Sequence, residues 1–322
     1  MTVPPVTSTD QLRLMAKIAR LYHQGNVKQP EIAARLGLSQ ARVSRLLKQA
    51  ETVGIVKTTV HMPLGVYADL EEQLEERYGL REVMVVDTGD ETEHVIPALG
   101  ASAASYLETA LVGVECIGIS SWSETLLATV NAMRPLGKSG TRQVIQVLGG
   151  LGRPSSQAHA TTLTERLAYY LGAQAVFLPV PGVVHSAGVF QNLLEDPGVA
   201  SVFASFDHLS LVLVGIGSLN PSRLIRESGN VISDQDLRAL HEAGAVGDVC
   251  QRFFDVNGGY IETVMHDRVM GISPDQLKKT PRRVGIAGGS SKFDAIRAAA
   301  RGGWIDTLIT DQHVAGRLLQ EG

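Results

Sequence analysis

Apolar residues in the first fifty positions recur at the three- and four-residue spacing of helices. The first predicted helix begins near Asp10, which is suited to cap it, and ends at Gly25, with Leu12, Met15, Ile18, Ala19 and Tyr22 on its inward face. A short helix then runs from near Pro30 to Gly37, and a longer one follows the N-cap residue Ser39, with Val43, Leu46, Leu47 and Ala50 facing inward. The pattern predicts a three-helix unit in which a tight Gly-Leu turn joins the last two helices.

A segment rich in β-branched residues follows these helices. Residues 55–61, IVKTTVH, are predicted to form a strand that could serve as a wing beside a DNA backbone. A hinge at Pro63, Leu64 and Gly65 comes next, and YADLEEQLEERYGL is predicted to be a charged helix. These signals put a domain boundary near residue 62, so we expect one domain over residues 1–62 and a second over residues 63–322.

The longer part of the chain alternates apolar runs with helical patterns. Short strands are predicted at residues 83–86, 116–119, 144–148, 175–178, 211–216 and 284–287, with helices at 98–111 and 125–133. This alternation is typical of an α/β domain with a parallel sheet covered on both faces. Ligands of such domains lie at the carboxyl ends of the strands, where the connecting loops converge.

The composition is that of an ordinary globular protein, with 44% hydrophobic and 19% charged residues in a chain of 322. No apolar run approaches the roughly 20 residues that cross a bilayer, and the N-terminus lacks the features of a secretory signal. We therefore expect a cytoplasmic protein without membrane contact. The two cysteines, Cys116 and Cys250, lie far apart among apolar residues and are expected to be reduced core thiols.

Charge is distributed unevenly along the chain. Residues 10–57 contain nine basic and three acidic residues, a net charge of +6, whereas the other 20 basic and 30 acidic residues of the chain give −10. A basic N-terminal domain on an acidic body suggests that the N-terminal domain binds a polyanion. The alternative is a solvated basic face on a small helical bundle.

The spacing A-x-x-L-G-L-S-x-x-x-V-S-R-L-L favours DNA binding over that alternative. It combines a small residue, a turn glycine and a helix cap in the order of a helix-turn-helix, whose second helix enters the major groove. Gln and Arg side chains can bond base edges, and Ser, Arg and Lys can reach phosphates. The predicted DNA-binding residues are Gln29, Ser39, Gln40, Arg42, Val43, Ser44, Arg45 and Lys48.

Four loops that follow predicted strands are rich in small residues: GISSWSETL, LGGLGRP, GIGSLNPS and GIAGGSSK. Glycine lets backbone amides approach an anion, and a helix N-terminus adds partial positive charge. Glycine in such turns can also serve packing alone. The residues predicted to bind an effector here are Gly118, Ser121, Trp122, Ser123, Thr125, Gly149, Gly150, Gly215, Gly217, Gly288, Gly289 and Lys292.

The segment GAVGDVCQRFFDVNGG adds four more effector-binding candidates. Asp248 and Asp255 could accept bonds from sugar hydroxyls, Arg252 could pair with a carboxylate or with the ligand, and Phe254 lies between them in sequence. An ion pair that serves only the structure is the alternative for Arg252. No metal site is predicted, because the histidines are scattered without a repeated spacing.

These motifs occur together, and in the same order, in one known family. Along nearly its whole length, from QPEIAARLGLSQARVSRLLKQ through IGISSWSETLLATV, VIQVLGGLG and GAVGDVCQRFFD to VGIAGGSSKFDAIRAAARGGWIDTLITD, the chain resembles the SorC/DeoR-type bacterial sugar-responsive transcriptional regulators. The resemblance implies a winged helix-turn-helix head and an α/β effector domain related to phosphosugar isomerases. It also implies a dimer or tetramer, with a sugar, commonly phosphorylated, held by loops at residues 118–126, 149–152, 215–218, 247–255 and 288–292.

One residue departs from the family pattern W-G-x-T-L, because Ser123 replaces the glycine that follows the tryptophan. The chain is thus expected to bind operator DNA under the control of a sugar or sugar phosphate, without catalysis or a cofactor. The alternative is an active phosphosugar isomerase or deaminase that uses Asp248 or Asp255 as its general base. Nucleotide binding by GGSSK is disfavoured, because the spacing G-x-x-x-x-G-K-[ST] is missing.

Overall fold

The computed structural model describes residues 9–57, 65–89, 92–137, 139–150, 153–220, 223–228, 232–263 and 265–321. The chain divides into two compact units, Met1–Met62 and Pro63–Gly322, which we call the head and the body. No helix in the described ranges is both long and apolar enough to span a membrane.

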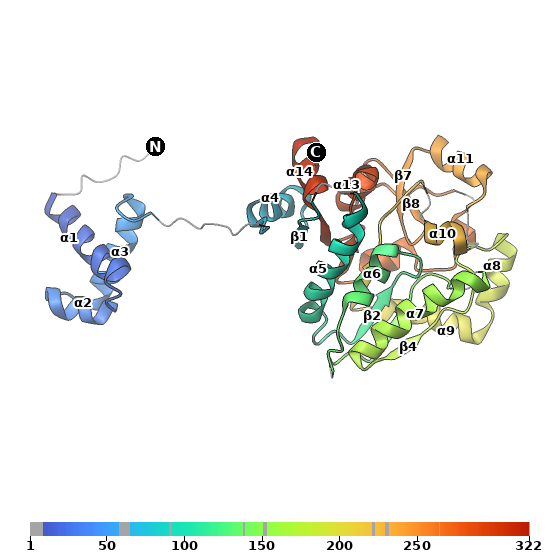
Figure 1. Ribbon diagram of the computed structural model, residues 1–322, viewed down its shortest axis with the longest axis horizontal. Helices are drawn as coiled ribbons and strands as arrows, with labels where there is room; N and C mark the ends of the chain where they lie inside the picture. Colours follow the sequence, from blue (N-terminus) through green and yellow to red (C-terminus); the bar gives the residue numbers. More distant parts are fainter. Residues whose placement is uncertain are drawn as a thin grey trace. The chain divides into compact units, whose positions relative to one another are not determined.

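Three helices form the head (Figure 1). Helix α1 (Thr9–Ala19) continues into a π-helical turn at Arg20–Gln24, and α2 (Gln29–Leu36) and α3 (Gln40–Thr52) follow. The predicted apolar faces meet in one core that contains Met15, Ile18, Ile32, Val43, Leu46, Leu47 and Ala50. Leu12 and Tyr22, which were also predicted to face inward, are exposed. Gly37 ends α2 with a φ of 65°, and the Ser39 hydroxyl accepts a bond from the Arg42 amide at 3.3 Å to cap α3. The three helices and the cap were all predicted from the sequence.

The predicted wing strand does not form in the part of it that the structure describes. Ile55 and Val56 form a bend after α3, and their amides both donate to the carbonyl oxygen of Ala50. These bonds extend the end of the helix, so the amides of these two residues are not available for pairing in a sheet. The remaining wing residues, 58–61, lie outside the described ranges.

The body is built on a seven-stranded sheet in the order β1-β10-β9-β5-β2-β3-β4, in which every pair is parallel. Its strands are β1 (Glu82–Val86), β2 (Cys116–Ile119), β3 (Gln143–Gln146), β4 (Gln174–Val176), β5 (Leu211–Val214), β9 (Arg283–Ile286) and β10 (Thr307–Asp311). The six predicted strands all exist, and β10 was not predicted. The α/β class with a large parallel sheet is therefore confirmed.

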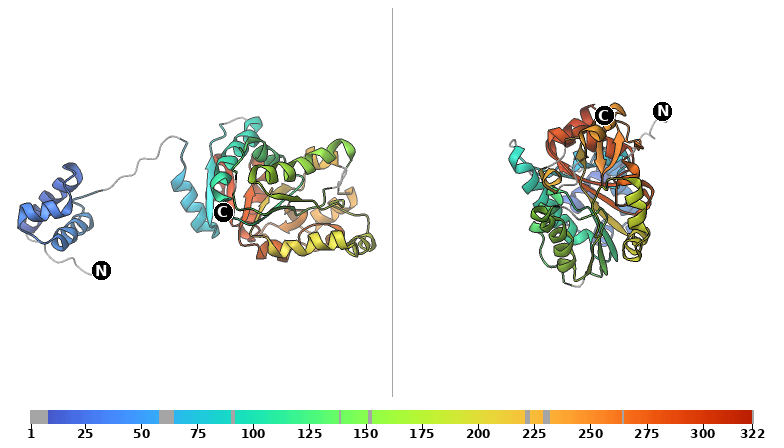
Figure 2. Two further views of the ribbon diagram at one scale, coloured as in Figure 1. Left: turned by 90° about the horizontal axis from the view of Figure 1, so that it is seen from below. Right: turned by 90° about the vertical axis from the view of Figure 1, so that its right-hand side faces the viewer.

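Helices cover both faces of this sheet (Figure 2). One face packs against α5 (Val95–Ala110), α6 (Glu124–Ala132) and α7 (Pro154–Leu171). The other packs against α4 (Ala68–Tyr78), α9 (Pro197–Ser205), α12 (Pro274–Lys279), α13 (Phe293–Arg301) and α14 (Gln312–Glu321). The remaining helices are α8 (Ala187–Leu194), α10 (Arg223–Ser228) and α11 (Asp234–Glu242).

A small antiparallel sheet stands apart from the large one. It consists of β6 (Gly217–Ser218), β7 (Ala245–Val249) and β8 (Arg252–Asp255), in the order β6-β7-β8. Cys250 and Gln251 alone connect β7 to β8, and both have positive φ, 53° and 61°. A two-residue hairpin of the type I′ class needs positive φ at both positions, which residues other than Gly, Asn and Asp adopt at a cost.

The order of the large sheet reverses between β2 and β5. From β2 the chain moves outward through β3 to β4, and from β5 it moves outward in the opposite direction through β9 to β10. At such a point the loops that leave the two neighbouring strands diverge, which opens a crevice at their carboxyl ends. The loops after β2, β5 and β9 lie around this crevice.

Candidate effector cavity and head surface

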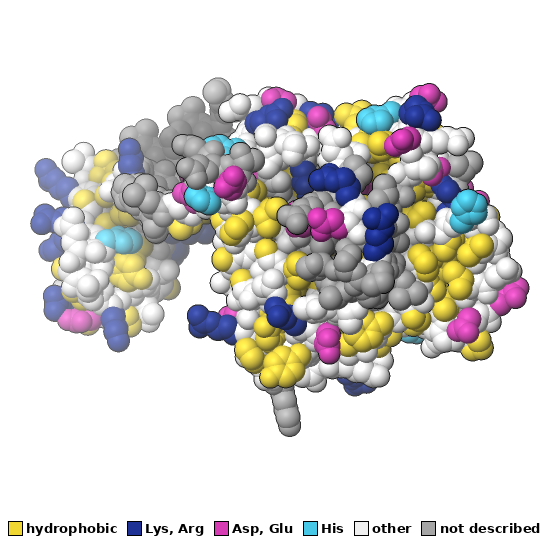
Figure 3. All heavy atoms as spheres, turned by 45° about the vertical axis from the view of Figure 1, so that its right-hand side comes forward, with side chains coloured by type: hydrophobic (Ala, Val, Ile, Leu, Met, Phe, Trp, Pro, Cys, Tyr) yellow, Lys and Arg dark blue, Asp and Glu magenta, His cyan; other side chains and the backbone are white. Residues whose placement is uncertain are grey.

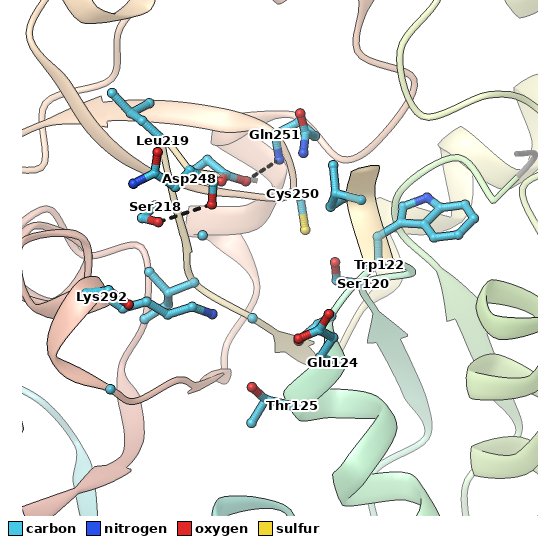
Figure 4. Close-up of a pocket in the computed structure, with 18 of the residues that line it drawn as sticks. Ser120, Trp122, Glu124, Thr125, Ser218, Leu219, Asp248, Cys250, Gln251 and Lys292 are labelled. Carbon is cyan, nitrogen blue, oxygen red and sulfur yellow. Dashed lines mark hydrogen bonds between the residues drawn. The ribbon is translucent and has the colours of Figure 1, made fainter. Parts of the chain in front are cut away.

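A cavity of about 330 Å³ lies at the carboxyl ends of β2, β5 and β9 and is bounded on one side by the β7–β8 hairpin (Figure 4). Its walls combine apolar side chains, among them Trp122, Ile216 and Phe253, with hydroxyl, amide and charged groups. This mixture of apolar walls and a few polar groups is typical of small-molecule sites. Of the predicted effector-binding residues, the structure brings nine to the cavity: Trp122, Ser123, Thr125, Gly215, Gly217, Asp248, Gly288, Gly289 and Lys292.

Three of the predicted glycines are packing positions and not part of the cavity wall. A Cβ on Gly118 would lie 2.7 Å from Val147 Cγ1, and one on Gly150 would lie 2.1 Å from Gln146 Nε2. A Cβ on Gly149 would lie 2.3 Å from the carbonyl oxygen of Pro181. These glycines are required because other parts of the fold approach them closely, and the structure places them outside the cavity.

Ser121 is also a structural residue. Its side chain is completely buried, and its hydroxyl donates to the carbonyl oxygen of Leu148 at 2.6 Å and accepts from Gln146 Nε2 at 2.8 Å. The loop after β3 supports the cavity wall without lining it at Gly149, since the indole Nε1 of Trp122 donates to the carbonyl oxygen of Gly149 at 2.9 Å. That bond fixes the orientation of the Trp122 ring in the cavity wall.

The alternation of side chains along β8 places Arg252 and Phe254 on the face of the strand that points away from the cavity. Asp248 and Phe253 are direct partners across the β7–β8 hairpin, so both lie on the face that lines the cavity. Successive side chains of a strand point to opposite faces, and Arg252 and Phe254 therefore point away from it. The Arg252 side chain, only 4% exposed, donates to the carbonyl oxygens of Ile272 at 3.0 Å and Gly271 at 3.1 Å.

Asp255 has a structural role as well. One of its carboxylate oxygens, Oδ1, accepts bonds from the backbone amides of Asn257 at 2.8 Å and Gly259 at 2.9 Å. These bonds close the turn that follows β8. The structure thus places Arg252, Phe254 and Asp255, all predicted to contact the effector, outside the cavity.

The loop after β2 brings Ser123, Glu124 and Thr125 to the cavity at the start of α6. The Ser123 hydroxyl accepts a bond from the Leu126 amide at 3.2 Å and so caps the helix. Gly215 in the loop after β5 packs against this cap, because a Cβ at that position would lie 2.5 Å from Ser123 Oγ. The loops of the two strands at the reversal point are therefore in direct contact.

The loop after β9 is held by Asp311 at the end of β10. The Gly289 amide donates to Asp311 Oδ2 at 2.7 Å, while Asp311 Oδ1 accepts from the amides of His313 and Val314, both at 3.0 Å. Gly289 has a φ of 92°, which requires glycine. One turn later, Lys292 extends into the cavity (Figure 4). Burial lowers the pKa of Lys292, and the negative charges of Asp248 and Glu124 partly oppose this change.

Asp248 is a half-buried carboxylate in the cavity wall. Burial raises its pKa to about 6, although a hydrogen bond from the Gln251 amide to Oδ2 at 2.9 Å and the charge of Lys292 favour the ionised form. Gly217 leaves room for this carboxylate, since a Cβ there would lie 2.1 Å from Asp248 Oδ1. The fold thus keeps a carboxylate in a partly desolvated site at the cost of its own stability.

Comparisons with known proteins agree with this architecture. Residues 63–320 match a family model described as "Putative sugar-binding domain". The chain is 31% identical over 323 residues to the sorbitol operon regulator of Klebsiella pneumoniae, covering 97% of this chain and 99% of that protein. The crystal structure of the full-length regulator, SorC, matches with a TM-score of 0.72 at 28% identity, over 97% of this chain and 100% of that one. The chain belongs to the SorC/DeoR-type family of sugar-binding bacterial transcriptional regulators.

A second relative of this SorC-type regulator is the erythritol catabolism regulatory protein EryD of Brucella abortus. The two are 32% identical over 312 residues, which cover 96% of each chain. Both alignments extend over head and body together.

Several residues of the cavity were missed by the sequence reasoning. Glu124 lies inside the predicted motif SSWSETL, and its charge was a signal that could have identified it. Cys250 and Gln251 lie in the loop at residues 247–255 that the resemblance implies, but they were not named individually, because nothing in the sequence marks them as a tight turn. Val95 and Ile96 at the start of α5, and Ile225 and Ile232 around α10, reach the cavity only through tertiary packing.

On the head, the structure exposes most of the predicted DNA-binding residues. Helix α3 presents Gln40, Arg42, Ser44, Arg45 and Lys48 to solvent, and Ser39 at its cap is exposed too, whereas Gln29 at the start of α2 is half-buried. Val43 is completely buried in the head core, so its side chain cannot contact DNA and that prediction was wrong. Figure 3 shows basic side chains spread over the visible face of the head.

Proposed function

We propose that this protein regulates the transcription of genes for carbohydrate metabolism by binding operator DNA under the control of a sugar or sugar phosphate held in the cavity. The observation that carries this proposal is the pairing, in one chain, of an exposed basic helix after a tight turn with a polar cavity at the reversal point of a parallel sheet. The full-length match to operon regulators supports it.

The head contacts DNA through α3. A recognition helix presents the residues of its first turns to base edges in the major groove, and Gln40, Arg42, Ser44 and Arg45 are exposed polar residues of these turns. Arginine can bond guanine with two hydrogen bonds, and the net charge of +6 in residues 10–57 adds attraction to the phosphates. Because one helix reads only a few base pairs, the protein acts as a dimer or tetramer on paired half-sites.

The effector acts from the body, and the cavity holds it without chemical change. The effector stabilises one arrangement of the subunits over another, and this difference alters how two heads fit their half-sites. The protein needs no metal or further cofactor for this role, and it works in the cytoplasm, where the chromosome is.

Catalysis by a phosphosugar isomerase is the alternative that we do not favour. Of the two proposed bases, Asp255 is bound to backbone amides outside the cavity, which leaves only Asp248. The relatives that match over their whole length are regulators by name, and the exposed basic helix has no use in an isomerase.

Fluorescence anisotropy with duplex DNA from the promoter region of its own gene tests the DNA-binding proposal. We expect salt-sensitive binding, and a loss of about 1–3 kcal/mol, or roughly 5- to 150-fold in Kd, for Arg42→Ala or Arg45→Ala. Arg134→Ala, at an exposed arginine of the body, is the matched control and should bind as the wild type does. Equal affinity of all four proteins for this DNA would exclude α3 as the recognition helix.

The effector proposal is tested by the same assay in the presence of a carbohydrate that changes the wild-type Kd. Without carbohydrate, Lys292→Ala should bind DNA as tightly as the wild type does, because Lys292 lines the cavity in the body and is not part of the head. Addition of the carbohydrate should no longer change the Kd of this variant for DNA. An unchanged dose response would remove Lys292 from the effector site.

A further inference from the structure

A stripe of three basic side chains runs along the outer side of helix α1. Arg13, Lys17 and Arg20 are spaced i, i+4 and i+7, which places them on one side of the helix, and all three are exposed. The opposite side carries the buried Met15. Among the described residues, the one ion pair of this stripe joins Arg13 to Asp10 at 3.7 Å, with side chains 79% and 92% exposed. Such an exposed pair contributes little to stability, so the stripe is open to an acidic partner.

The α1 stripe is not part of the surface that α3 presents to solvent. Helices α1 and α3 turn their apolar sides to the same core, so their outer sides point in different directions. A duplex bound by the outer side of α3 therefore does not account for the basic residues on the outer side of α1.

Helix α4 carries a matching stripe of acidic side chains. Asp69, Glu72 and Glu76 are exposed and lie on one side of the helix, three and four residues apart. The other two acidic residues, Glu71 and Glu75, accept bonds from backbone amides of β1, both at 2.8 Å. No ion pair within the described ranges engages the three exposed carboxylates. Of the helices that the structure describes, α4 alone has three exposed acidic residues on one side.

The two stripes match in charge and spacing when the helices run antiparallel. Steps of four and three residues along α1 then meet steps of four and three residues along α4 in the reverse direction. The pairs are Arg13 with Glu76, Lys17 with Glu72, and Arg20 with Asp69. In this register Asp10 lies opposite Gly79 and Arg77 opposite Leu12, so no like charges face each other. The basic residues of α3 are spaced by three and three residues and do not fit this pattern.

From this complementarity we infer that α1 in the head of one copy docks antiparallel on α4 in the body of a second copy of this chain. The three ion pairs set the register and the direction of the contact, which is what charged groups at an interface do best. Because the pairs are made of exposed charges, the contact weakens as salt rises. The inference goes beyond the proposed function, since it does not depend on what the head or the cavity binds.

Cross-linking between copies tests the contact directly, with the full chain and without DNA. One chain carries Lys17→Cys, and a second chain with a size tag carries Glu72→Cys. The axes of packed helices lie about 8–10 Å apart, so a short bismaleimide joins the two thiols. We expect a mixed product at low salt that is lost at about 1 M salt, where the Debye length is roughly 3 Å.

The matched control pairs Lys17→Cys with Glu242→Cys, at an exposed acidic residue of α11. This pair should give no more mixed product than two wild-type chains, whose cysteines are the half-buried Cys116 and the buried Cys250. A product from Lys17→Cys and Glu72→Cys that is no stronger than that of the control overturns the inference.

Charge reversal gives a second measure, the Kd of self-association in sedimentation velocity. The two variants are Arg13→Glu, Lys17→Glu, Arg20→Glu in α1 and Asp69→Lys, Glu72→Lys, Glu76→Lys in α4. Each variant alone should self-associate about tenfold more weakly than the wild type, because like charges then face each other. An equimolar mixture of the two should recover the wild-type Kd, because stripes of opposite sign meet again between unlike chains.

The mixture separates a second copy from other partners of the α1 stripe. If the stripe binds DNA phosphates instead, the α1 variant loses DNA affinity but self-associates as the wild type does, and the inference fails. A mixture as weak as its two parts also overturns it. The control Glu115→Lys, Glu165→Lys, Glu242→Lys makes the same change of net charge at exposed residues elsewhere in the body and should associate as the wild type does. Circular dichroism shows that each variant is folded.

Discussion

Replacing Asp248 by Asn should stabilise the effector-free protein, by an amount that grows with pH. Burial raises the pKa of Asp248 from 3.8 to about 6, so the folded state binds this proton more tightly than the unfolded state does. Between these two pKa values the folded state holds more protons, and the free energy of unfolding therefore falls as pH rises. An amide at this position does not titrate, and it can still accept the bond from the Gln251 amide.

The magnitude follows from the size of the shift. A difference of about 2 pKa units corresponds to about 3 kcal/mol of stability lost by the wild type above pH 6. Roughly 2 kcal/mol of this develops between pH 4.5 and pH 7.5, because part of the loss has already occurred at the lower pH. The difference in the free energy of unfolding between Asp248→Asn and the wild type isolates the contribution of Asp248, since the contributions of the other carboxylates are the same in both proteins and cancel.

Urea unfolding followed by tryptophan fluorescence measures this difference in the body alone, because the two tryptophans of the chain, Trp122 and Trp304, are both in the body. Glu76→Gln, at an exposed carboxylate of α4, is the control and should change the free energy of unfolding by less than about 0.5 kcal/mol at either pH. A difference between Asp248→Asn and wild type that is the same at pH 4.5 and 7.5 would refute the assignment of a raised pKa to Asp248.

Three other changes test the packing of the cavity and the head. Gly217→Ala should destabilise the body by about 1–3 kcal/mol in urea unfolding, because its Cβ would lie 2.1 Å from Asp248 Oδ1. Gly316→Ala in α14 is the control and should stabilise the body by about 0.5–1 kcal/mol, because a Cβ there meets nothing within 4 Å. Similar effects of the two alanines would contradict the close approach. Gln251→Gly should stabilise the body by about 0.5–1 kcal/mol through relief of the positive φ of 61° at this position. A loss of stability would argue against strain in the turn. Ser39→Ala should cost the head about 1 kcal/mol and raise the hydrogen exchange of α3 amides about fivefold, and unchanged exchange would argue against the cap.

The sequence by itself determined the local elements. Helical spacing, the Gly37 turn and the Ser39 cap were enough to predict the head, since these signals act within a few residues. Apolar runs predicted six of the strands and the parallel sheet of the body. The small residues that follow β2, β5 and β9 line one cavity, because the carboxyl ends of parallel strands lie on one edge of the sheet. Their role in effector binding stays a prediction.

Tertiary structure decided which of these loops meet. The reversal of strand order between β2 and β5 brings Ser123 against Gly215. In the loop after β3, Gly149 packs on Pro181 and Gly150 packs on Gln146, so neither glycine lines the cavity. The β7–β8 hairpin turns Asp248 and Phe253 toward the cavity and Arg252 away from it. A one-dimensional pattern gives the chemistry of a residue and its place in an element. The face that it occupies in a hairpin, and the neighbours that compete for its side chain, depend on contacts between distant segments.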